Sequence, residues 1–255
     1  MLNKVIKIVK EASKIMLNDS FNVMEKDGVT NLVTTNDIAV QDYLVKELSK
    51  LLPNSGFFLE EGDERDSSEE YVWIIDPIDG TTNYARHISV CAISVALVKN
   101  NEVILGVIYN PYQKLLFHSV KGKGAYLNRK RIHVSTKSFK EAILYTAFSA
   151  YNKKESYKAF RFAEDIFPYV NDLRRTGSAA FEIASIGAGR GDMFLEIKLQ
   201  PWDYAAASLI LTEAGGYISG INENELPLFK PTIIIAANNK ENHHLLVEKA
   251  KEYFN

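Results

Sequence analysis

With 255 residues, of which 46% are hydrophobic and 24% are charged, the chain has the composition of a globular protein and can bury a sizeable core. The formal charge of -2 gives no electrostatic reason to expect general nucleic-acid binding. Lysines occur throughout the N-terminal residues, and no window approaches about 18 consecutive apolar residues. We therefore expect a soluble, cytoplasmic protein with neither a signal peptide nor a membrane span.

The first third of the chain predicts two helices followed by two short strands. Apolar residues at helical spacing over residues 2–17 indicate an amphipathic helix. A second helix is expected to begin at Thr35, as its N-cap, and to stop before Pro53. The segments GFFLEE and YVWIID then indicate two strands, and we expect the polar loop between them, residues 62–70, to be solvated and mobile.

The rest of the chain divides into a β-rich part and an alternating part. Between residues 88 and 134, short turns separate β-rich runs, which favours an antiparallel meander. Cys91 lies in one of these runs and is expected to be a buried thiol. After Ser138, strand-like and helix-like segments alternate, which favours a layered α/β arrangement. We expect one compact unit over the whole chain with two lobes, residues 1–136 and residues 137–255.

The segment WIIDPIDGTTNY, residues 73–84, places two aspartates around a proline at the end of a strand-like run. Because Pro77 has no backbone N–H, we expect sheet pairing to stop there, with Asp76 at the end of the strand. Asp76 and Asp79 should then converge on one side of the following turn. The alternative is an Asp-rich turn in which the side chains cap their own backbone.

The residues after these aspartates indicate a turn that leads into a short helix. Gly80 permits a tight turn, and Thr81 and Thr82 can cap the helix that follows. The backbone N–H groups of Gly80 and Thr81 would then lie at a helix N-terminus, which is a natural cradle for a phosphate group.

Three further acidic residues, at two other places in the chain, are candidates for the same site. Glu60 and Glu61 end a strand-like run, and Asp203 stands near the start of a helix-like segment, where it could also be a plain N-cap. If these residues meet the two aspartates of the turn, carboxylates about 4 Å apart would repel by roughly 4 kcal/mol per pair. Only cations would make such a cluster tolerable. Because every donor atom is oxygen, Mg²⁺ is favoured over Zn²⁺.

Three segments in order, LEE, WIIDPIDGTTN and WDYAAASLILTEAGG, resemble the signatures of the inositol monophosphatase family of Mg²⁺-dependent, lithium-sensitive phosphatases. The resemblance extends over nearly the whole chain, through LVTTND, KGKGAYLN, LRRTGSAA, GRGD and IIIAANN. It implies an α+β fold, a layered α-β-α-β-α sandwich of the inositol monophosphatase and fructose-1,6-bisphosphatase type. It also implies a homodimer.

The resemblance implies roles for the acidic residues and for one threonine. The implied ligands of two or three Mg²⁺ ions are Glu60, Asp76, the backbone carbonyl of Ile78, Asp79 and Asp203. Glu60 and Thr81 are implied to orient a metal-bound water molecule, and Asp37, with Lys26 upstream, to support them.

The resemblance also implies a substrate pocket. The N–H groups of Gly80 and Thr81 are expected to hold the phosphate group. The expected lining of the pocket is Gly177, Ser178 and Ala179, with Glu196 in contact with sugar-like hydroxyls of the substrate. The alternative for Glu196 is an exposed strand residue without a role in binding.

Two basic pairs have weaker interpretations. Arg174 and Arg175 could reach a second phosphate of a larger substrate, or could be solvated or lie at a dimer contact. His243 and His244 have no acidic or thiol partners in a ligand pattern on their amphipathic segment, so we expect both on the surface.

The implied function is a phosphoric monoester hydrolase that acts on inositol monophosphate or a similar small phosphate. The expected mechanism is direct in-line attack by water activated by Mg²⁺, without a covalent intermediate. Alternative substrates are NADP(H), fructose 1,6-bisphosphate, histidinol phosphate and a nucleotide 3′-phosphate. A non-enzymatic alternative is a binding partner of the transcription machinery. The complete set of acidic residues favours the enzyme.

Overall fold

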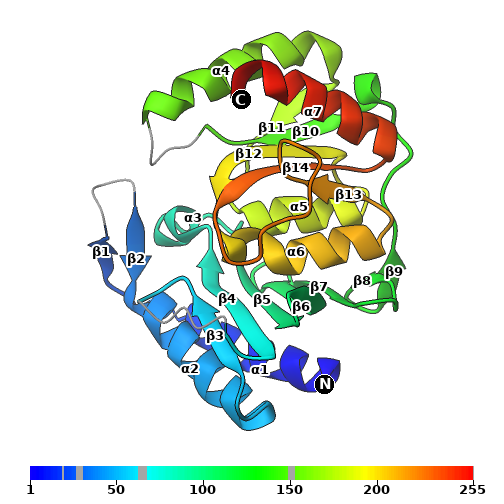
Figure 1. Ribbon diagram of the computed structural model, residues 1–255. Helices are drawn as coiled ribbons and strands as arrows, with labels where there is room; N and C mark the ends of the chain where they lie inside the picture. Colours follow the sequence, from blue (N-terminus) through cyan, green and yellow to red (C-terminus); the bar gives the residue numbers. More distant parts are fainter. Residues whose placement is uncertain (19, 27–30, 63–67, 149–152, 255) are drawn as a thin grey trace.

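The computed structural model describes residues 1–18, 20–26, 31–62, 68–148 and 153–254. From one side to the other, the layers are two helices, a seven-stranded sheet, two helices, a five-stranded sheet and two helices (Figure 1). The helices of these layers are α1 (Leu2–Met16) with α2 (Thr35–Leu51), α5 (Ala179–Gly187) with α6 (Pro201–Glu213), and α4 (Lys153–Ile166) with α7 (Lys240–Phe254). This arrangement confirms the expected α-β-α-β-α sandwich.

The seven-stranded sheet follows chain order and is antiparallel except for its first pair, β3 and β4, which is parallel. Its strands are β3 (Gly56–Leu59), β4 (Tyr71–Asp79), β5 (Ala92–Lys99), β6 (Glu102–Asn110), β7 (Leu115–Val120), β8 (Ala125–Leu127) and β9 (Lys130–Ile132). The strands from β5 onward confirm the antiparallel meander that the short turns predict.

The five-stranded sheet is mixed and has the order β11-β10-β12-β14-β13. Its strands are β10 (Ile143–Thr146), β11 (Asp172–Arg174), β12 (Met193–Leu199), β13 (Tyr217–Ser219) and β14 (Thr232–Ala237). The smaller elements are the antiparallel pair β1 (Val23–Glu25) and β2 (Leu32–Thr34), the helix α3 (Thr81–Ala85), and 3-10 turns at Phe139–Glu141 and Phe167–Tyr169. Within the described residues, no helix combines the length and the hydropathy that crossing a bilayer requires.

Strand β4 has helices on both of its faces. Trp73 and Ile75 belong to the apolar core under α1 and α2, whereas Val72 and Ile74 belong to the core under α5 and α6. Because successive side chains of a strand point to opposite faces, a strand covered on both sides must be apolar throughout. The apolar run ends at Asp76, so the first polar side chain of the strand lies at its buried C-terminal end.

Helix α2 begins one residue earlier than the sequence predicts. Thr34, and not Thr35, is the N-cap, because the Thr34 hydroxyl accepts a hydrogen bond from the Asp37 N–H at 3.3 Å. The Asp37 side chain in turn accepts from the Thr34 N–H, which completes a reciprocal cap. The helix ends at Leu51, before Pro53, as expected.

The prediction that pairing stops at Pro77 is wrong. Strand β4 continues to Asp79, and its register with β5 shifts between Asp76 and Asp79. At such an irregularity a residue is left out of the hydrogen-bond ladder, so the missing N–H of the proline costs no pairing.

The structure contradicts one of three other side-chain predictions and confirms two. His243 is 5% exposed and its Nε2 lies 3.0 Å from the Ser219 Oγ, so the prediction that it lies on the surface is wrong; His244 is exposed, as expected. Cys91 is fully buried, and burial raises the pKa of its thiol to about 12, which confirms a structural thiol. Residues 63–67 of the loop that we expect to be mobile lie outside the described residues.

Helix α6 packs very closely on strand β6. A Cβ atom on Gly106 would lie 2.7 Å from the carbonyl oxygen of Ala206. Since both atoms sit on backbone that is held by a sheet or a helix, neither can move alone. The glycine therefore sets the distance between the seven-stranded sheet and the helix that carries Asp203.

We expect Gly106→Ala to lower the free energy of unfolding by about 1–3 kcal/mol, because the added methyl group must push the helix from the sheet. Denaturant unfolding of the purified variant measures the loss. Gly187→Ala is the matched control, since its Cβ would meet its nearest atom at an ordinary 3.5 Å. An equal effect of the two substitutions would contradict this account of the packing.

Candidate active site

Three carboxylates meet where strand β4 ends and helix α6 begins. Asp76, Asp79 and Asp203 each place one oxygen so that the three atoms lie within 4.8 Å of one another. Asp76 and Asp79 are 2% and 6% exposed. The Asp76 Oδ1 accepts the N–H of Ile78 at 2.9 Å, which keeps the turn between the two aspartates compact.

Asp203 is the third residue of α6 and not its N-cap. Gln200 is the N-cap, and its N–H donates to the Asp203 Oδ2 at 2.8 Å. Asp203 therefore helps to close the helix N-terminus while its carboxylate lies beside the two aspartates of β4. A role as a plain N-cap would not explain why the Asp203 carboxylate lies beside those of Asp76 and Asp79.

Burial and mutual repulsion raise the pKa values of this cluster. Burial, followed by the charges of Glu60 and Asp79, raises the pKa of Asp76 well above its ordinary value. Burial and the same two neighbours raise the pKa of Asp203. Burial raises the pKa of Asp79 to about 7, although hydrogen bonds from Ser178 and Ala180 oppose the shift. The cluster thus strongly favours a bound cation, whether a proton or a metal ion.

Asp79 joins strand β4 to the N-terminus of helix α5. Its carboxylate accepts the Ser178 Oγ–H at 2.6 Å, the Ala180 N–H at 2.8 Å and the Ala179 N–H at 3.2 Å. The two N–H groups belong to the first turn of the helix, which cannot satisfy them internally. The predicted metal ligand therefore also closes the N-terminus of a helix in the layer between the sheets.

Thr81 and Asp37 lie next to the cluster. The Thr81 Oγ1 lies 3.2 Å from the Asp37 Oδ1 and 3.1 Å from the Ile78 carbonyl oxygen. Asp37 is fully buried, and burial raises its pKa to about 6. Gly80 is the N-cap of α3, with a left-handed φ of 92°, so the expectation that the Thr81 and Thr82 hydroxyls cap this helix is wrong.

Lys26 connects the β1–β2 pair to the acidic end of β3. Its Nζ lies 3.1 Å from the Glu60 Oε1 and 2.5 Å from the Glu61 Oε1. Burial raises the pKa of Glu61 to about 7. The side chain of Gln41 exchanges two hydrogen bonds with the Glu61 backbone, at 2.8 and 3.0 Å, a contact that no sequence motif indicated.

Glu196 lies on β12 and is half-buried. Burial, then the charges of Glu182 and Asp79, raise its pKa to about 8, while Arg175 opposes the shift. Glu196 is therefore not a fully exposed strand residue, and its contact with the substrate stays a prediction. Arg174 instead pairs with Asp172 on the surface.

Gly177 lies in the turn before α5, with a φ of 87° that favours glycine. A Cβ atom on Gly80 would lie only 3.0 Å from the Gly177 carbonyl oxygen, so the two turns are in close contact. Asn83 belongs to the motif at residues 73–84 but was not predicted as a site residue. Its Nδ2 donates to the carbonyl oxygens of Thr176 and Val90, both at 2.7 Å. The site is therefore built from two touching turns.

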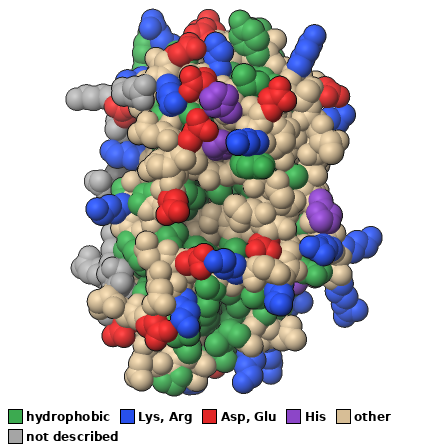
Figure 2. Space-filling view, turned by 45° about the vertical axis from the view of Figure 1, so that its right-hand side comes forward, with side chains coloured by type: hydrophobic (Ala, Val, Ile, Leu, Met, Phe, Trp, Pro, Cys, Tyr) green, Lys and Arg blue, Asp and Glu red, His purple; other side chains and the backbone are tan. Residues whose placement is uncertain are grey.

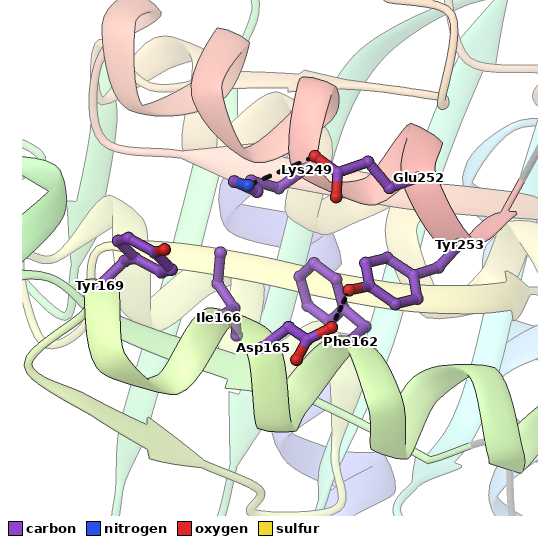
Figure 3. Close-up of a pocket in the computed structure, with 7 residues that line it drawn as sticks. All are labelled: Phe162, Asp165, Ile166, Tyr169, Lys249, Glu252 and Tyr253. Carbon is purple, nitrogen blue, oxygen red and sulfur yellow. Dashed lines mark hydrogen bonds and ion pairs between the residues drawn. The ribbon is translucent and has the colours of Figure 1, made fainter.

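A cavity of about 210 Å³ lies away from these carboxylates, between α4 and α7 (Figure 3). Four of its polar side chains pair with one another, because the Tyr253 hydroxyl bonds Asp165 and the Lys249 Nζ lies 3.3 Å from the Glu252 Oε1. We assign no function to this cavity. Its lining is Phe162, Asp165, Ile166, Tyr169, Lys249, Glu252 and Tyr253.

A second group of potential ligands, Glu223, His244 and Glu248, lies exposed on the surface. The Lys251 Nζ lies 2.7 Å from the Glu248 Oε1, so an ammonium group already neutralises that carboxylate. Acidic and basic side chains are interspersed over most of the face that Figure 2 shows. We assign no metal site to this group.

Comparison with known proteins identifies the family of this chain. The model of the inositol monophosphatase family matches residues 1–254. The fructose-1,6-bisphosphatase/inositol-1-monophosphatase of Aquifex aeolicus is 33% identical over 98% of this chain and 95% of its own length, and the Nus factor SuhB of Escherichia coli is 34% identical over 86% and 84%. The structure of the Thermotoga maritima IMPase has a TM-score of 0.89 at 32% identity and covers 99% of this chain and 97% of that one. This chain therefore belongs to the inositol monophosphatase family of phosphoric monoester hydrolases.

Proposed function

We propose that this protein hydrolyses inositol monophosphate, or a phosphate monoester of similar size, with Mg²⁺ as its cofactor. The observation that carries the proposal is the convergence of Asp76, Asp79 and Asp203 within 4.8 Å at a buried strand end. Family membership supports the same chemistry.

The proposed ligands of two or three Mg²⁺ ions are Glu60, Asp76, the backbone carbonyl of Ile78, Asp79 and Asp203. This donor set fits the ion, since all its atoms are oxygens and no thiol or imidazole of the described residues takes part. When bound, Mg²⁺ supplies a water molecule of lowered pKa and neutralises the charge of the phosphate group.

We propose that Thr81 and Glu60 orient the attacking water. A hydroxyl has one proton and two lone pairs, so when Thr81 donates to Asp37, at 3.2 Å, it can accept a hydrogen bond from water. An ionised carboxylate accepts hydrogen bonds only, and the Glu60 Oε1 lies 3.1 Å from the Lys26 Nζ. Asp37 is held in place by the Thr34 N–H at 2.8 Å.

The two touching turns are the proposed substrate site. The N–H groups of Gly80 and Thr81 would hold the phosphate, and Gly177, with Ala179, would line the wall beside it. Glu196 would contact hydroxyl groups of the alcohol portion. Because the Ser178 hydroxyl already donates to Asp79, we propose that Ser178 lines the pocket without donating to the substrate.

The names of two relatives indicate further functions to test. The Aquifex aeolicus relative carries both fructose-1,6-bisphosphatase and inositol-1-monophosphatase in its name, which favours a sugar bisphosphate as second substrate. The Escherichia coli relative is a Nus factor, which favours a partner in the transcription machinery as a second role. Phosphate release over a panel of inositol monophosphate, fructose 1,6-bisphosphate, NADP⁺ and adenosine 3′,5′-bisphosphate ranks the substrates.

Homodimer formation, a cytoplasmic location and the two-lobe division at residue 136 stay predictions.

A chelator should abolish phosphate release, and Mg²⁺ should restore it. Asp76→Asn should remain folded but lose at least about 100-fold in kcat, because it removes one of the three clustered carboxylate charges that would hold Mg²⁺. Li⁺ in place of Na⁺ should inhibit the Mg²⁺-loaded protein at millimolar concentrations. Undiminished turnover of Asp76→Asn, or full activity in chelator, would refute the metal assignment.

The thermal stability gained from Mg²⁺ should grow with pH. In the metal-free protein the pKa of Asp79 is about 7, and that of Asp76 is also raised, against about 3.9 in an unfolded chain. The folded state therefore binds more protons, so its free energy of unfolding falls as pH rises from about 4 through 7. Mg²⁺ replaces these protons, and we expect it to raise Tm by at least about 5 °C more at pH 8 than at pH 5.

The measurement is the difference in Tm between Mg²⁺ and chelator at each pH. The pKa values of His118 and His243 are lowered by burial, so their titration changes stability in the opposite direction. Taking the difference removes this contribution. A gain from Mg²⁺ that shrinks as pH rises would contradict the assignment of the carboxylates as ligands.

Asp203 and Glu196 are seven residues apart but should have separable tasks. Asp203→Asn keeps an acceptor for the Gln200 N–H but loses the ligand charge, so it should depress kcat/KM on every monoester, including an aryl phosphate. Glu196→Gln should lower kcat/KM for inositol monophosphate by about 10- to 100-fold and spare the aryl phosphate. An equal loss on both substrates with Glu196→Gln would place this residue in the catalytic or folding machinery instead.

A further inference from the structure

A second buried carboxylate, Glu182, reaches backward from helix α5 into the turn that precedes it. Glu182 is 2% exposed, and its Oε1 accepts the Gly177 N–H at 3.2 Å and the Thr176 N–H at a shorter distance. The helix begins at Ala179, with Ser178 as its N-cap. The side chain thus bonds residues that lie outside the helix, which helix capping alone does not require.

The donors at this helix start are divided between two carboxylates. Asp79 takes the N–H groups of Ala179 and Ala180 and the hydroxyl of Ser178. Glu182 takes the two N–H groups that precede them in the chain. The helix start is therefore held by Asp79 of the carboxylate cluster, whereas the turn is held by Glu182 from within its own helix.

The turn held by Glu182 forms part of the wall of the proposed substrate site. The Gly177 carbonyl oxygen lies against Gly80, and Asn83 bonds the Thr176 carbonyl at 2.7 Å. Glycine at position 177 leaves the backbone free to take other conformations, so the two hydrogen bonds to Glu182 restrict a segment that is otherwise soft.

We propose that Glu182 is a positioning residue that holds the turn of Thr176 and Gly177 in the shape that receives the substrate. Its role depends on the reach of its acceptor oxygen and not on its charge. The effect on substrate use rests on the function proposed above, whereas the hold on the turn does not. Mg²⁺ binding should be nearly independent of Glu182, because Asp79 keeps three donors of its own.

The chain contains a matched control in Glu213. Its Oε1 accepts the Gly122 N–H at 2.6 Å and its Oε2 the Gly124 N–H at 2.7 Å, so it too holds a glycine-containing turn by two backbone bonds. Glu213 is the last residue of α6, at the opposite end from Asp203. Its loss tests what breaking such a pair of bonds does to the fold alone.

The variants to compare in the full-length protein are Glu182→Ala, Glu182→Asp, Glu182→Gln and Glu213→Ala. Aspartate keeps the charge but shortens the reach, and glutamine keeps the reach but removes the charge. Three measurements are made on each: amide hydrogen exchange of the peptide containing Thr176 and Gly177, calorimetric Mg²⁺ affinity, and kcat and KM for inositol monophosphate.

We expect Glu182→Ala and Glu182→Asp to speed exchange at these two amides and to raise KM at least about tenfold. Their kcat and Mg²⁺ affinity should change by less than about threefold. Glu182→Gln should restore KM and exchange to within about threefold of the unsubstituted protein. Glu213→Ala should lower Tm and leave KM unchanged. If Glu182→Ala does not fold, Glu182→Asp against Glu182→Gln decides the question.

Two results would overturn the proposal. One is an unchanged KM and unchanged exchange in Glu182→Asp. The other is a loss in Glu182→Gln as large as that in Glu182→Asp, which would make charge, and not reach, the property that matters. If the unsubstituted protein released no phosphate from inositol monophosphate, the proposed function would fail, and hydrogen exchange would still decide whether Glu182 holds the turn.

Discussion

Repulsion among buried carboxylates is the constraint that organises this site. Two unit charges within 4.8 Å of each other repel by at least about 3.5 kcal/mol at an effective dielectric near 20, and the ionised carboxylates of Asp76, Asp79 and Asp203 would form three such pairs. The fold nevertheless holds them together, by a register shift at the end of β4 and by packing α6 on the sheet through Gly106. A bound divalent cation is the direct way to relieve this repulsion.

The middle layer of the fold contributes a second source of positive potential. Helices α5 and α6 lie side by side between the two sheets (Figure 1) and both begin at the cluster, α5 with its N–H groups on Asp79 and α6 with Asp203 in its first turn. The N-terminus of a helix carries a partial positive charge that stabilises nearby carboxylates and phosphates. The same arrangement that tolerates the ligands therefore also suits an anionic substrate. Glu182 fixes the turn just before α5, so the ordered backbone continues from the helix start to the wall of the proposed substrate site.

The sequence allowed prediction of what is local and left open what depends on distant packing. The motif at residues 73–84 predicted that Asp76 and Asp79 converge, because strand ends and turns are marked by short-range signals. The position of Asp203 beside them was implied only by the family resemblance. The continuation of β4 through Pro77 was not predictable, since it depends on how β5 accommodates the missing N–H. His243 looked like a surface residue because its partner, a serine of β13, lies far away in the sequence. Glu182 lies in an apolar helix, and nothing in the sequence of that helix indicates that its carboxylate bonds residues outside it.

Anomalous X-ray diffraction from crystals soaked in Mn²⁺ locates the cations bound at the carboxylates, because Mn²⁺ takes the same oxygen ligands as Mg²⁺ and scatters anomalously. We expect anomalous peaks within coordination distance of the carboxylates of Asp76, Asp79 and Asp203. We also expect these peaks to disappear in crystals of Asp76→Asn. Absence of a peak between these carboxylates, or a peak only at the surface group around His244, would contradict a metal site at the end of β4.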